Sequence, residues 1–385
     1  MKKNQPKYYP ALDGVRGWMA FGVLVAHVHL PWFPGAMMLM ELFFVVSGFL
    51  ITSIIWRNVT KHGRVNLVEF WKRRLLRLYP VLIVVVVVFT GIALLVVEDP
   101  GPSLKDAAAT LFYVSNFTKL YDYHFPTLFG QTWSLAIEEQ FYLLWPVLFW
   151  CLLRFRLNTF SVAGFLILIA AACTLWKIYL INSGAPWSRL YYAPDTRMDA
   201  FVAGGLLALF YPHLQQWCQR PLSHALLVLG SCAYLVLLAF GTPHEMAYFH
   251  WQQSTAIVLC SMLTLLLVSP RNSAFKSLFS TRASVFFGQR CYSIYLWHWP
   301  VIWMLLVTLN PDRLVLLAIT LPLVLALSCL SYSYVEIPFQ AIRNSSARPE
   351  PAAKDATVPT PVKPIMPLLA DTAAPSINTK QASPI

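Results

Sequence analysis

The sequence predicts an all-α protein, a polytopic membrane helix bundle of about ten transmembrane helices. Of its 385 residues, 57% are hydrophobic and only 12% are charged, and the mean hydropathy is +0.57. Apolar runs of about 17 to 22 residues recur along the chain, which is the length that an α-helix needs to cross a bilayer. Soluble globular domains of ordinary composition lack this combination.

Short polar connections separate the apolar runs. The sixth run is short and begins with the charged stretch DTRMDAFVAGG, and the connection at about 98–131 holds one apolar segment, 104–117, that is too short to cross. After Arg343 the composition turns to Pro, Ala, Ser, Thr and Lys, which is typical of a disordered tail. We therefore expect one transmembrane domain over 1–342 and a tail over 343–385. The expected spans are 11–31, 36–56, 80–97, 135–153, 160–181, 197–212, 223–240, 253–269, 290–309 and 313–335.

The net charge of +12 follows the topology of a membrane protein and does not indicate a nucleic-acid partner. Basic residues are concentrated in alternate connections, around Lys61, Arg154 and Arg220, whereas acidic residues such as Asp106 and Glu245 predominate in the others. Positively charged connections stay on the cytoplasmic side, so this asymmetry predicts that both termini are cytoplasmic.

The seven cysteines form neither a disulfide framework nor a metal-binding pattern. They lie in or beside apolar runs without a CxxC spacing, as small core residues do. The first apolar run is not followed by the small-residue cleavage pattern of a signal peptide, so we expect it to remain in the protein as a span.

That first run carries Arg16 and His27 inside an otherwise hydrophobic helix. A separation of eleven positions is about three turns plus 20°, so both side chains lie on one face, roughly 16 Å apart along the axis. Charged groups inside a membrane are costly and usually face a cavity where they serve a site. Taken singly, Arg16 could extend to the membrane surface and His27 could be an ordinary interfacial histidine. The shared face favours a site with His27 as general base.

Glu41 begins the second apolar run, after the turn HLPWFPG. Counting from Pro34, His27 is seven residues back and Glu41 seven forward, so an antiparallel hairpin would place both at similar depth. Glu41 would then orient His27, unless it only marks the interfacial end of a span. Ser47, further along the run, would be a nucleophile only with a base beside it, and small residues there more often allow close helix packing.

The segment FWKRRLLRLYP, at the cytoplasmic start of the third span, carries Arg73, Arg74 and Arg77. Their i, i+3 and i, i+4 spacings gather guanidinium groups on one side of a helix, which suits phosphate-bearing ligands or lipid head groups. The same residues could be no more than a topology signal.

The segment TWSLAIEEQFYLLWP places Glu138 and Glu139 in the first turns of the fourth span. Acidic residues there can simply stabilise the positive end of the helix. Beside Trp133, at the outer membrane surface, they also suit a site that faces a carbohydrate.

Two further polar positions stand in apolar surroundings. His298 lies in CYSIYLWHWP, two residues before a proline, and we expect it to contact the substrate, although the aromatic residues beside it are common at membrane interfaces. Arg197 and Asp199 in RMDAFVAGG are expected to form structural ion pairs with other helices.

Five motifs in this order resemble those of integral-membrane acyltransferase family 3: LDGVRGWMAFGVLVAHV, ELFFVVSGFLIT, FWKRRLLRLYP, TWSLAIEEQFYLLWP and YSIYLWHWP. The resemblance extends from about Tyr9 to Pro338. The family includes bacterial O-acetyltransferases of lipopolysaccharide O-antigen and exopolysaccharide, and macrolide acyltransferases. It implies a ten-helix bundle in the cytoplasmic (inner) membrane of a bacterium. Such a bundle takes an acyl group from a cytoplasmic acyl-CoA, usually acetyl-CoA, and delivers it to a hydroxyl, commonly of a carbohydrate at the outer face.

The resemblance also implies roles for the residues above. The Arg-x10-His pair of the family falls on Arg16 and His27, and its basic motif on Arg73, Arg74 and Arg77. Acyl-CoA is then a donor substrate, and no permanently bound cofactor is expected. The expected catalytic residues are His27, Arg16 and Glu41. The expected donor-binding residues are Arg73, Arg74 and Arg77. The expected acceptor-binding residues are Glu138, Trp133 and His298.

Other functions stay open at this point. A transporter or flippase of a lipid-linked or small substrate would also carry intramembrane charges, but the sequence has no internal repeat or paired broken helices. An acyltransferase could act on a secondary metabolite such as a macrolide. A receptor or scaffold would not need Arg16 and His27 on one face.

Overall fold

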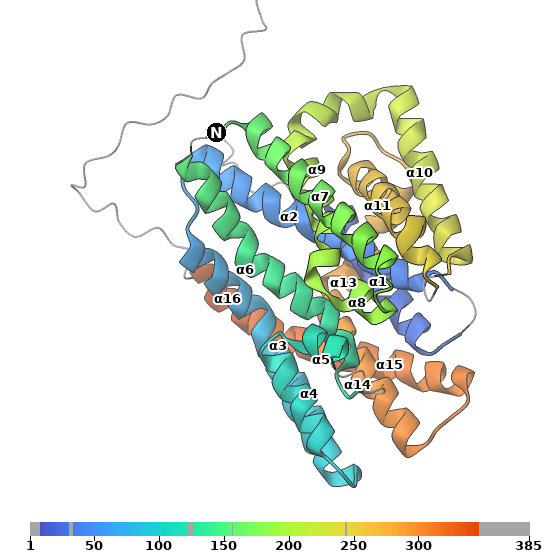
Figure 1. Ribbon diagram of the computed structural model, residues 1–385. Coiled ribbons are helices and arrows are strands. Elements are labelled where there is room, and N and C mark those ends of the chain that lie inside the picture. The colour runs from blue at the N-terminus through green and yellow to red at the C-terminus, as the bar shows by residue number, and fades with distance from the viewer. Residues whose placement is uncertain (1–7, 31–33, 122–126, 156, 243–244, 346–385) are drawn as a thin grey trace, which may run out of the picture. The chain divides into compact units, whose positions relative to one another are not determined.

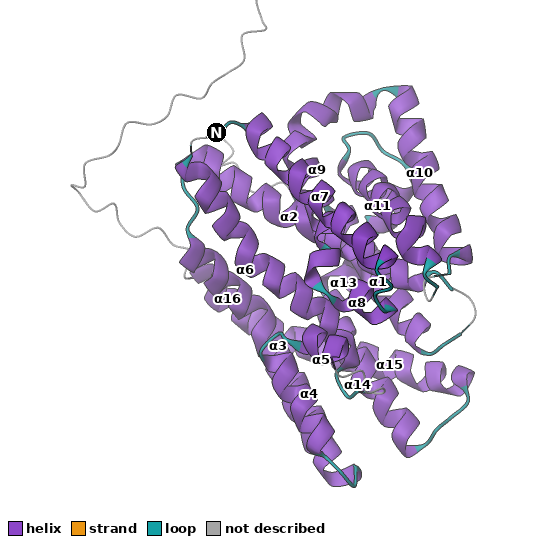
Figure 2. Ribbon diagram, in the orientation of Figure 1, coloured by secondary structure: helices purple, strands orange, loops and turns teal. Residues whose placement is uncertain are grey.

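A computed structural model describes residues 8–30, 34–121, 127–155, 157–242 and 245–345. Within these residues the chain forms helices and no strands, which confirms the all-α prediction (Figure 2). Ten longer helices occupy the positions of the ten expected spans: α1 (Pro10–His27), α2 (Leu39–His62), α3 (Leu67–Val96), α6 (Trp133–Arg154), α7 (Thr159–Asn182), α9 (Met198–Gln219), α10 (Pro221–Phe240), α11 (Gln253–Val268), α14 (Cys291–Thr308) and α15 (Arg313–Ser331).

Eight of the described helices are long and apolar enough to cross a membrane: α2, α3, α6, α7, α10, α11, α14 and α15. The other two contain ionisable residues, Asp13 and Arg16 in α1 and Asp199 in α9. The protein is therefore a multi-pass membrane protein, and the crossing of α1 and α9 stays a prediction.

Short helices occupy several connections. The connection after α3 holds α4 (Gly101–Leu111) and α5 (Ser115–Tyr121). The others are α8 (Trp187–Tyr192), α12 (Ala274–Phe279), α13 (Arg282–Gln289) and α16 (Ile337–Ser345). Helix α16 packs against α3 (Figure 1). It extends slightly past residue 343, and residues 346–385 of the expected tail lie outside the described residues.

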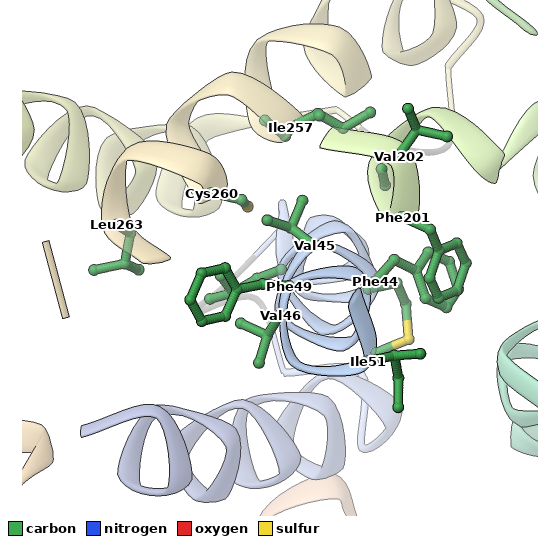
Figure 3. Close-up of a cluster of buried hydrophobic side chains, with 14 of the residues drawn as sticks. Phe44, Val45, Val46, Phe49, Ile51, Phe201, Val202, Ile257, Cys260 and Leu263 are labelled. Atoms are coloured by element: carbon green, nitrogen blue, oxygen red, sulfur yellow. The ribbon is translucent and has the colours of Figure 1, made fainter. Parts of the chain in front are cut away.

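Helix α2 lies among α9, α11 and α1, and its Phe44, Val45 and Phe49 are buried in the main apolar core (Figure 3). The closest packing is against α9, at two glycines. A Cβ atom on Gly48 would lie 2.1 Å from the Phe201 carbonyl oxygen, and one on Gly204 would lie 2.0 Å from that of Val45. Small residues are what allow two membrane helices to approach this closely.

Helix α1 begins at Pro10, a residue suited to the first turn, and ends at His27. Its first half packs on α12 and α13, where a Cβ atom on Gly17 would lie 2.5 Å from the Gly288 amide nitrogen. Helix α14 also packs against α1 and contacts it at His27. These neighbours fix the rotation of α1, and with it the direction in which Arg16 and His27 point.

Candidate active site

A cavity of about 700 Å³ lies at the C-terminal end of α1 and is lined by His27. Its wall comes from the turn after α1, from α5 and α8, from the 3₁₀ segment η2 (Gly130–Thr132), and from the connection between α10 and α11. The charge pattern assigned all these connections to one side of the membrane, and the structure gathers them around one cavity. Members of this wall include Leu30, Lys119, Gln131, Trp187, Thr242 and Glu245.

His27 is held by two partners that determine which of its ring nitrogens carries the proton. Its Nδ1 lies 2.9 Å from the Val23 carbonyl oxygen, and the Nδ1 of His298 lies 2.6 Å from that of Tyr295. A carbonyl oxygen only accepts, so each Nδ1 is a donor. His27 Nδ1 then also donates to His298 Nε2 at 3.2 Å. The neutral His27 ring keeps an unprotonated Nε2, which is the form that a general base needs.

His298 does not line the large cavity as expected. Its side chain is fully buried, and its sequence neighbours Tyr295 and Trp299 line the wall instead. His298 points from α14 toward α1 and meets His27, so within the described structure its contact is with His27, and the predicted substrate contact stays a prediction. The sequence showed a second histidine within an apolar run, but it did not show that this histidine contacts His27, 271 positions away.

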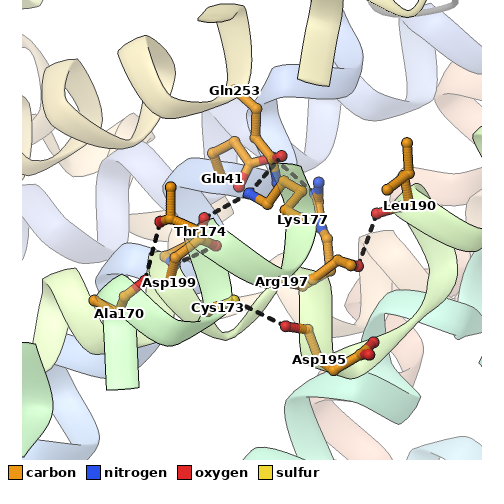
Figure 4. A network of polar contacts seen from close by, with 12 residues as sticks. Glu41, Ala170, Cys173, Thr174, Lys177, Leu190, Asp195, Arg197, Asp199 and Gln253 are labelled. Atoms are coloured by element: carbon orange, nitrogen blue, oxygen red, sulfur yellow. Dashed lines mark hydrogen bonds and ion pairs between the residues drawn. The ribbon is translucent and has the colours of Figure 1, made fainter. Parts of the chain in front are cut away.

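Glu41 pairs with Arg197 and Tyr248 instead of His27, which corrects the expected His27–Glu41 contact. Its Oε1 lies 2.7 Å from Arg197 Nη2 and accepts a hydrogen bond of 2.5 Å from the Tyr248 hydroxyl. Glu41 and Arg197 are both fully buried (Figure 4). Met40 lines the cavity, and Glu41, one residue on, is turned about 100° around the helix. This rotation directs Glu41 to α9 and to the π-helical segment η4 (Tyr248–Gln252).

A second buried ion pair lies next to the first (Figure 4). Lys177 Nζ of α7 lies 2.6 Å from Asp199 Oδ2 of α9 and donates to Gln253 Oε1 of α11 at 2.9 Å. Arg197 and Asp199 thus each pair with another helix, which confirms the predicted ion pairs, and their structural role stays a prediction. Together the two pairs connect α2, α7, α9 and the start of α11.

Arg16 lines a second, smaller cavity of about 30 Å³. Glu138 lies in the same wall and within electrostatic range of Arg16. Met40 and Tyr295 line both cavities, so the two cavities adjoin at these side chains. The spacing in α1 therefore does what the sequence predicted, because His27 and Arg16 face two adjoining spaces at different depths.

Glu138 and Trp133, which the sequence analysis grouped together, line different cavities. Trp133 lines the large cavity and Glu138 lines the small one, so of the two only Trp133 stands where an acceptor was expected. Glu138 accepts hydrogen bonds from the hydroxyls of Ser47 and Tyr142. Tyr142 also donates to Ser47 Oγ at 3.0 Å. The carboxylate beside Ser47 is thus Glu138 of α6 and not Glu41 of its own helix, a contact that sequence reasoning missed.

The three arginines at the start of α3 fall into two groups. Arg73 is exposed and forms an ion pair with the carboxylate four residues earlier in the same helix. Arg74 is half-buried, with its guanidinium carbon 4.2 Å from the centre of the Tyr142 ring. Arg77 lies within electrostatic range of Arg16. Arg74 and Arg77, two of the three predicted donor-binding residues, therefore lie near Tyr142 and Arg16, on the side of the small cavity.

Aromatic side chains that the sequence analysis did not single out form much of the large cavity's wall. The rings of Trp187 and Tyr191 stack at 4.4 Å, and Tyr192 and Trp299 complete the surface. Such a surface with few polar groups is typical of small-molecule sites. The signal was present in the run WSRLYY, since it lies in a connection that the charge pattern assigned to the outer side.

Lys119 of α5 adds a positive charge to this wall. Burial lowers the pKa of its ammonium group to about 8, while attraction to Asp106 raises it. Burial likewise raises the pKa of Asp106 to about 6, against the lowering effect of Lys119 and of nearby amides. Between these values both groups are ionised, so near neutral pH the wall carries an attracting pair and not an isolated cation.

Comparison with known proteins identifies the family of this chain. The family model described as "Acyltransferase domain" matches residues 9–333. The O-acetyltransferase OatA of Staphylococcus aureus (strain NCTC 8325 / PS 47) is 32% identical over 323 residues, which cover 78% of this chain and 52% of that protein. The protein named "Putative O-acetyltransferase SACOL0978" of Staphylococcus aureus (strain COL) is 31% identical over 357 residues, with 88% and 58% covered.

The chain spans about half the length of these curated relatives. No solved structure matches it. The family match extends over α1 to α15 and includes both cavities and the arginines of α3. The protein therefore belongs to the integral-membrane acyltransferase family that its five motifs resemble.

Proposed function

We propose that the protein is a membrane O-acetyltransferase that moves the acyl group of a cytoplasmic acyl-CoA to a hydroxyl of a cell-envelope carbohydrate. The observation that carries this proposal is the junction of two cavities, one lined by Arg16 and the other by His27. A donor that enters past Arg77 would pass its pantetheine arm along Arg16 and bring its thioester to the large cavity beside His27. An acceptor in the large cavity would bring its hydroxyl to His27.

The chemistry follows from this arrangement. The acceptor oxygen attacks the thioester carbonyl carbon while His27 Nε2 takes the hydroxyl proton. The C–O bond forms, the C–S bond breaks, and the CoA thiolate takes the proton from His27, so the products are an ester and neutral CoA. Arg16, about three turns from His27 on the same face, lines the route of the donor and holds its pantetheine arm, and Glu138 keeps the guanidinium in place.

The orientation in the membrane belongs to the same proposal. The cationic residues of α3 would face the cytoplasm, where CoA is available, and the large cavity would open outward in a bacterial cytoplasmic membrane. Both termini would be cytoplasmic. The gathering of the less basic connections around the large cavity supports this orientation.

The activity is tested with the purified protein in proteoliposomes, labelled acetyl-CoA, and envelope glycans extracted from cells that lack the protein. We expect alkali-labile label on the glycan with the wild type. Label on an added macrolide and on no glycan would change the acceptor class. Passage of glycan across the vesicle membrane without acyl transfer would overturn the proposal in favour of a transporter.

Replacing Arg74 and Arg77 by glutamine is expected to raise the KM for acetyl-CoA more than it lowers kcat, because binding of the donor phosphates is lost equally in the ground and transition states. Donor titration in vesicles measures this. Arg73→Gln is the matched control, since Arg73 is exposed and paired with Glu69, and its donor KM should stay near that of the wild type. An unchanged donor KM in the double variant would show that these arginines determine the orientation in the membrane and do not bind the donor.

His298 is expected to act on catalysis only through His27. His298→Leu removes one of the two acceptors of the His27 Nδ1 proton, the other being the Val23 carbonyl, and should lower kcat by about tenfold, the lower end of the effect known for groups that orient metal-binding histidines. His298→Gln, whose side-chain oxygen can accept the same proton, should restore part of the rate and of the pH profile. Equal losses in the two variants, with unchanged pH profiles, would indicate a packing role alone.

A further inference from the structure

A series of guanidinium groups leads from the small cavity to helix α16. Arg16 lines that cavity, and Arg77 lies within electrostatic range of it. Arg77 is also within range of Arg74, which precedes it in α3, and Arg74 is within range of Arg343 in α16. The series therefore joins α1, α3 and α16. Like charges repel one another, so a row of cations needs negative charge beside it.

Carboxylates of α6 provide that charge for the inner part of the series. Glu138 lies within electrostatic range of Arg16. Glu139 lies within range of the two arginines of α3 in the series, Arg74 and Arg77. These three cations are thus compensated by the protein itself, as charges inside a membrane protein usually are.

Arg343, at the outer end of the series, has no such compensation. Helix α16 packs against α3 (Figure 1), and Phe339, Gln340 and Arg343 are the half-buried residues of α16. Their i, i+3 and i, i+4 spacings place all three on one face, so Arg343 is held at the contact with α3. Its guanidinium forms no hydrogen bond or ion pair with a described residue. The charged groups within its range are Arg73 and Arg74, both cations, so the position suits an anionic ligand.

The order of the series matches the order of the groups along an acyl-CoA. Under the proposed function, the thioester lies beside His27, and the pantetheine arm passes Arg16, roughly 16 Å away along α1. The diphosphate follows the arm and would lie by Arg77 and Arg74. The phosphate on the 3′-oxygen of the ribose comes after the diphosphate, far from the thioester. The cation that follows Arg74 in the series is Arg343.

We infer that Arg343 binds the 3′-phosphate of the acyl-CoA donor, an inference that rests on the proposed function. This phosphate monoester carries about two negative charges and three acceptor oxygens, which a guanidinium group can bind in a bidentate manner. A hydrogen bond between charged groups changes affinity by about tenfold or more. We therefore expect the wild type to have a KM for acetyl-CoA about tenfold below that for acetyl-3′-dephospho-CoA.

The experiment titrates these two donors in phosphatidylcholine proteoliposomes, with glycans extracted from cells that lack the protein as the acceptor. Arg343→Gln should raise the KM for acetyl-CoA about tenfold, to that of the dephospho donor, and leave kcat and the KM for the dephospho donor unchanged. Lys72→Gln is the matched control, because it removes an exposed charge at the start of α3 that is not within range of Arg343. Its ratio of the two KM values should equal that of the wild type. Arg343→Lys keeps the charge but not the bidentate geometry, so it should give an intermediate ratio, and it keeps the test open if Arg343→Gln does not fold.

The outcomes separate the two proposals. Equal KM values for the two donors in the wild type overturn the inference alone, and so does an unchanged ratio in a folded Arg343→Gln or Arg343→Lys variant. A rise of both KM values by one factor in Arg343→Gln also overturns it. If phosphatidylglycerol in the vesicles then alters that factor, the anion bound by Arg343 is a lipid head group. An equal loss of discrimination in Lys72→Gln overturns the inference in favour of a general surface charge. Transfer from neither donor by the wild type overturns the proposed function, and the inference with it.

Discussion

Replacing His27 by alanine is expected to lower the rate of acyl transfer by about 10²- to 10⁴-fold, while the protein stays inserted and folded. The reason is that a weakly acidic sugar hydroxyl attacks a thioester only when a base removes its proton. His27 lines the large cavity, and its Nδ1 donates to Val23 and His298, so its Nε2 is the available base. Labelled acetyl transfer to extracted glycans, at saturating donor and acceptor, measures the loss.

His29 provides the matched control two residues on. It lines the same cavity, but its backbone is in the left-handed region with φ 58°, and its carbonyl oxygen accepts from Arg313. Asparagine tolerates this conformation, so His29→Asn removes an imidazole from the cavity without backbone strain. It should keep most of the activity. If His27→Ala turns over at a near-normal rate with normal expression, the base has been assigned to the wrong residue.

The second large effect is on stability. Arg197→Leu leaves the Glu41 carboxylate buried without its cation, and breaking a buried pair in this way costs about 3 to 5 kcal/mol. The Tyr248 hydroxyl remains as a donor to Glu41 but cannot neutralise its charge. We expect a clearly lower midpoint of thermal unfolding in detergent, followed by the loss of monodisperse protein on size exclusion.

A partly exposed arginine gives the comparison. Arg189→Leu removes an ion pair with Asp195 that is partly exposed to solvent, and such pairs contribute about 0 to 1 kcal/mol. The double variant Glu41→Leu with Arg197→Met removes both buried charges and should regain much of the stability, because well-packed apolar residues often replace a buried pair without loss. A stable double variant that still transfers acetyl would show that Glu41 is structural. A fully stable Arg197→Leu protein would contradict the expected cost.

Depth along each helix could be predicted from the sequence, but rotation about the helix axis could not. The spacing of Arg16 and His27 within one helix gave their common face, because both lie on one rigid element. Counting from Pro34 led us to expect Glu41 beside His27, but the rotation of Glu41 on α2 depends on packing against α9. Gly48 and Gly204 determine that packing through a close approach that a single sequence does not reveal.

Contacts between distant helices were missed for the same reason. Ser47 and Glu138 come from α2 and α6, and nothing in either segment indicates the other. The arginines of α3 were correctly assigned to one helix start, but only the fold separates exposed Arg73 from Arg74 and Arg77. The aromatic residues around Tyr191 were visible in the composition of the sequence, but only the fold shows that four connections bring them together in one wall.

Most of the wall of the large cavity is built from connections between helices, whereas the small cavity is built from the helices themselves. Connections tolerate substitution, insertion and exchange far better than packed helices do. During divergence, the recipient of the acyl group can therefore change while the route of the donor stays the same. Chimeras that exchange only residues 183–196 and 241–247 between distant homologues would be the natural starting point for redirecting such proteins to new recipients.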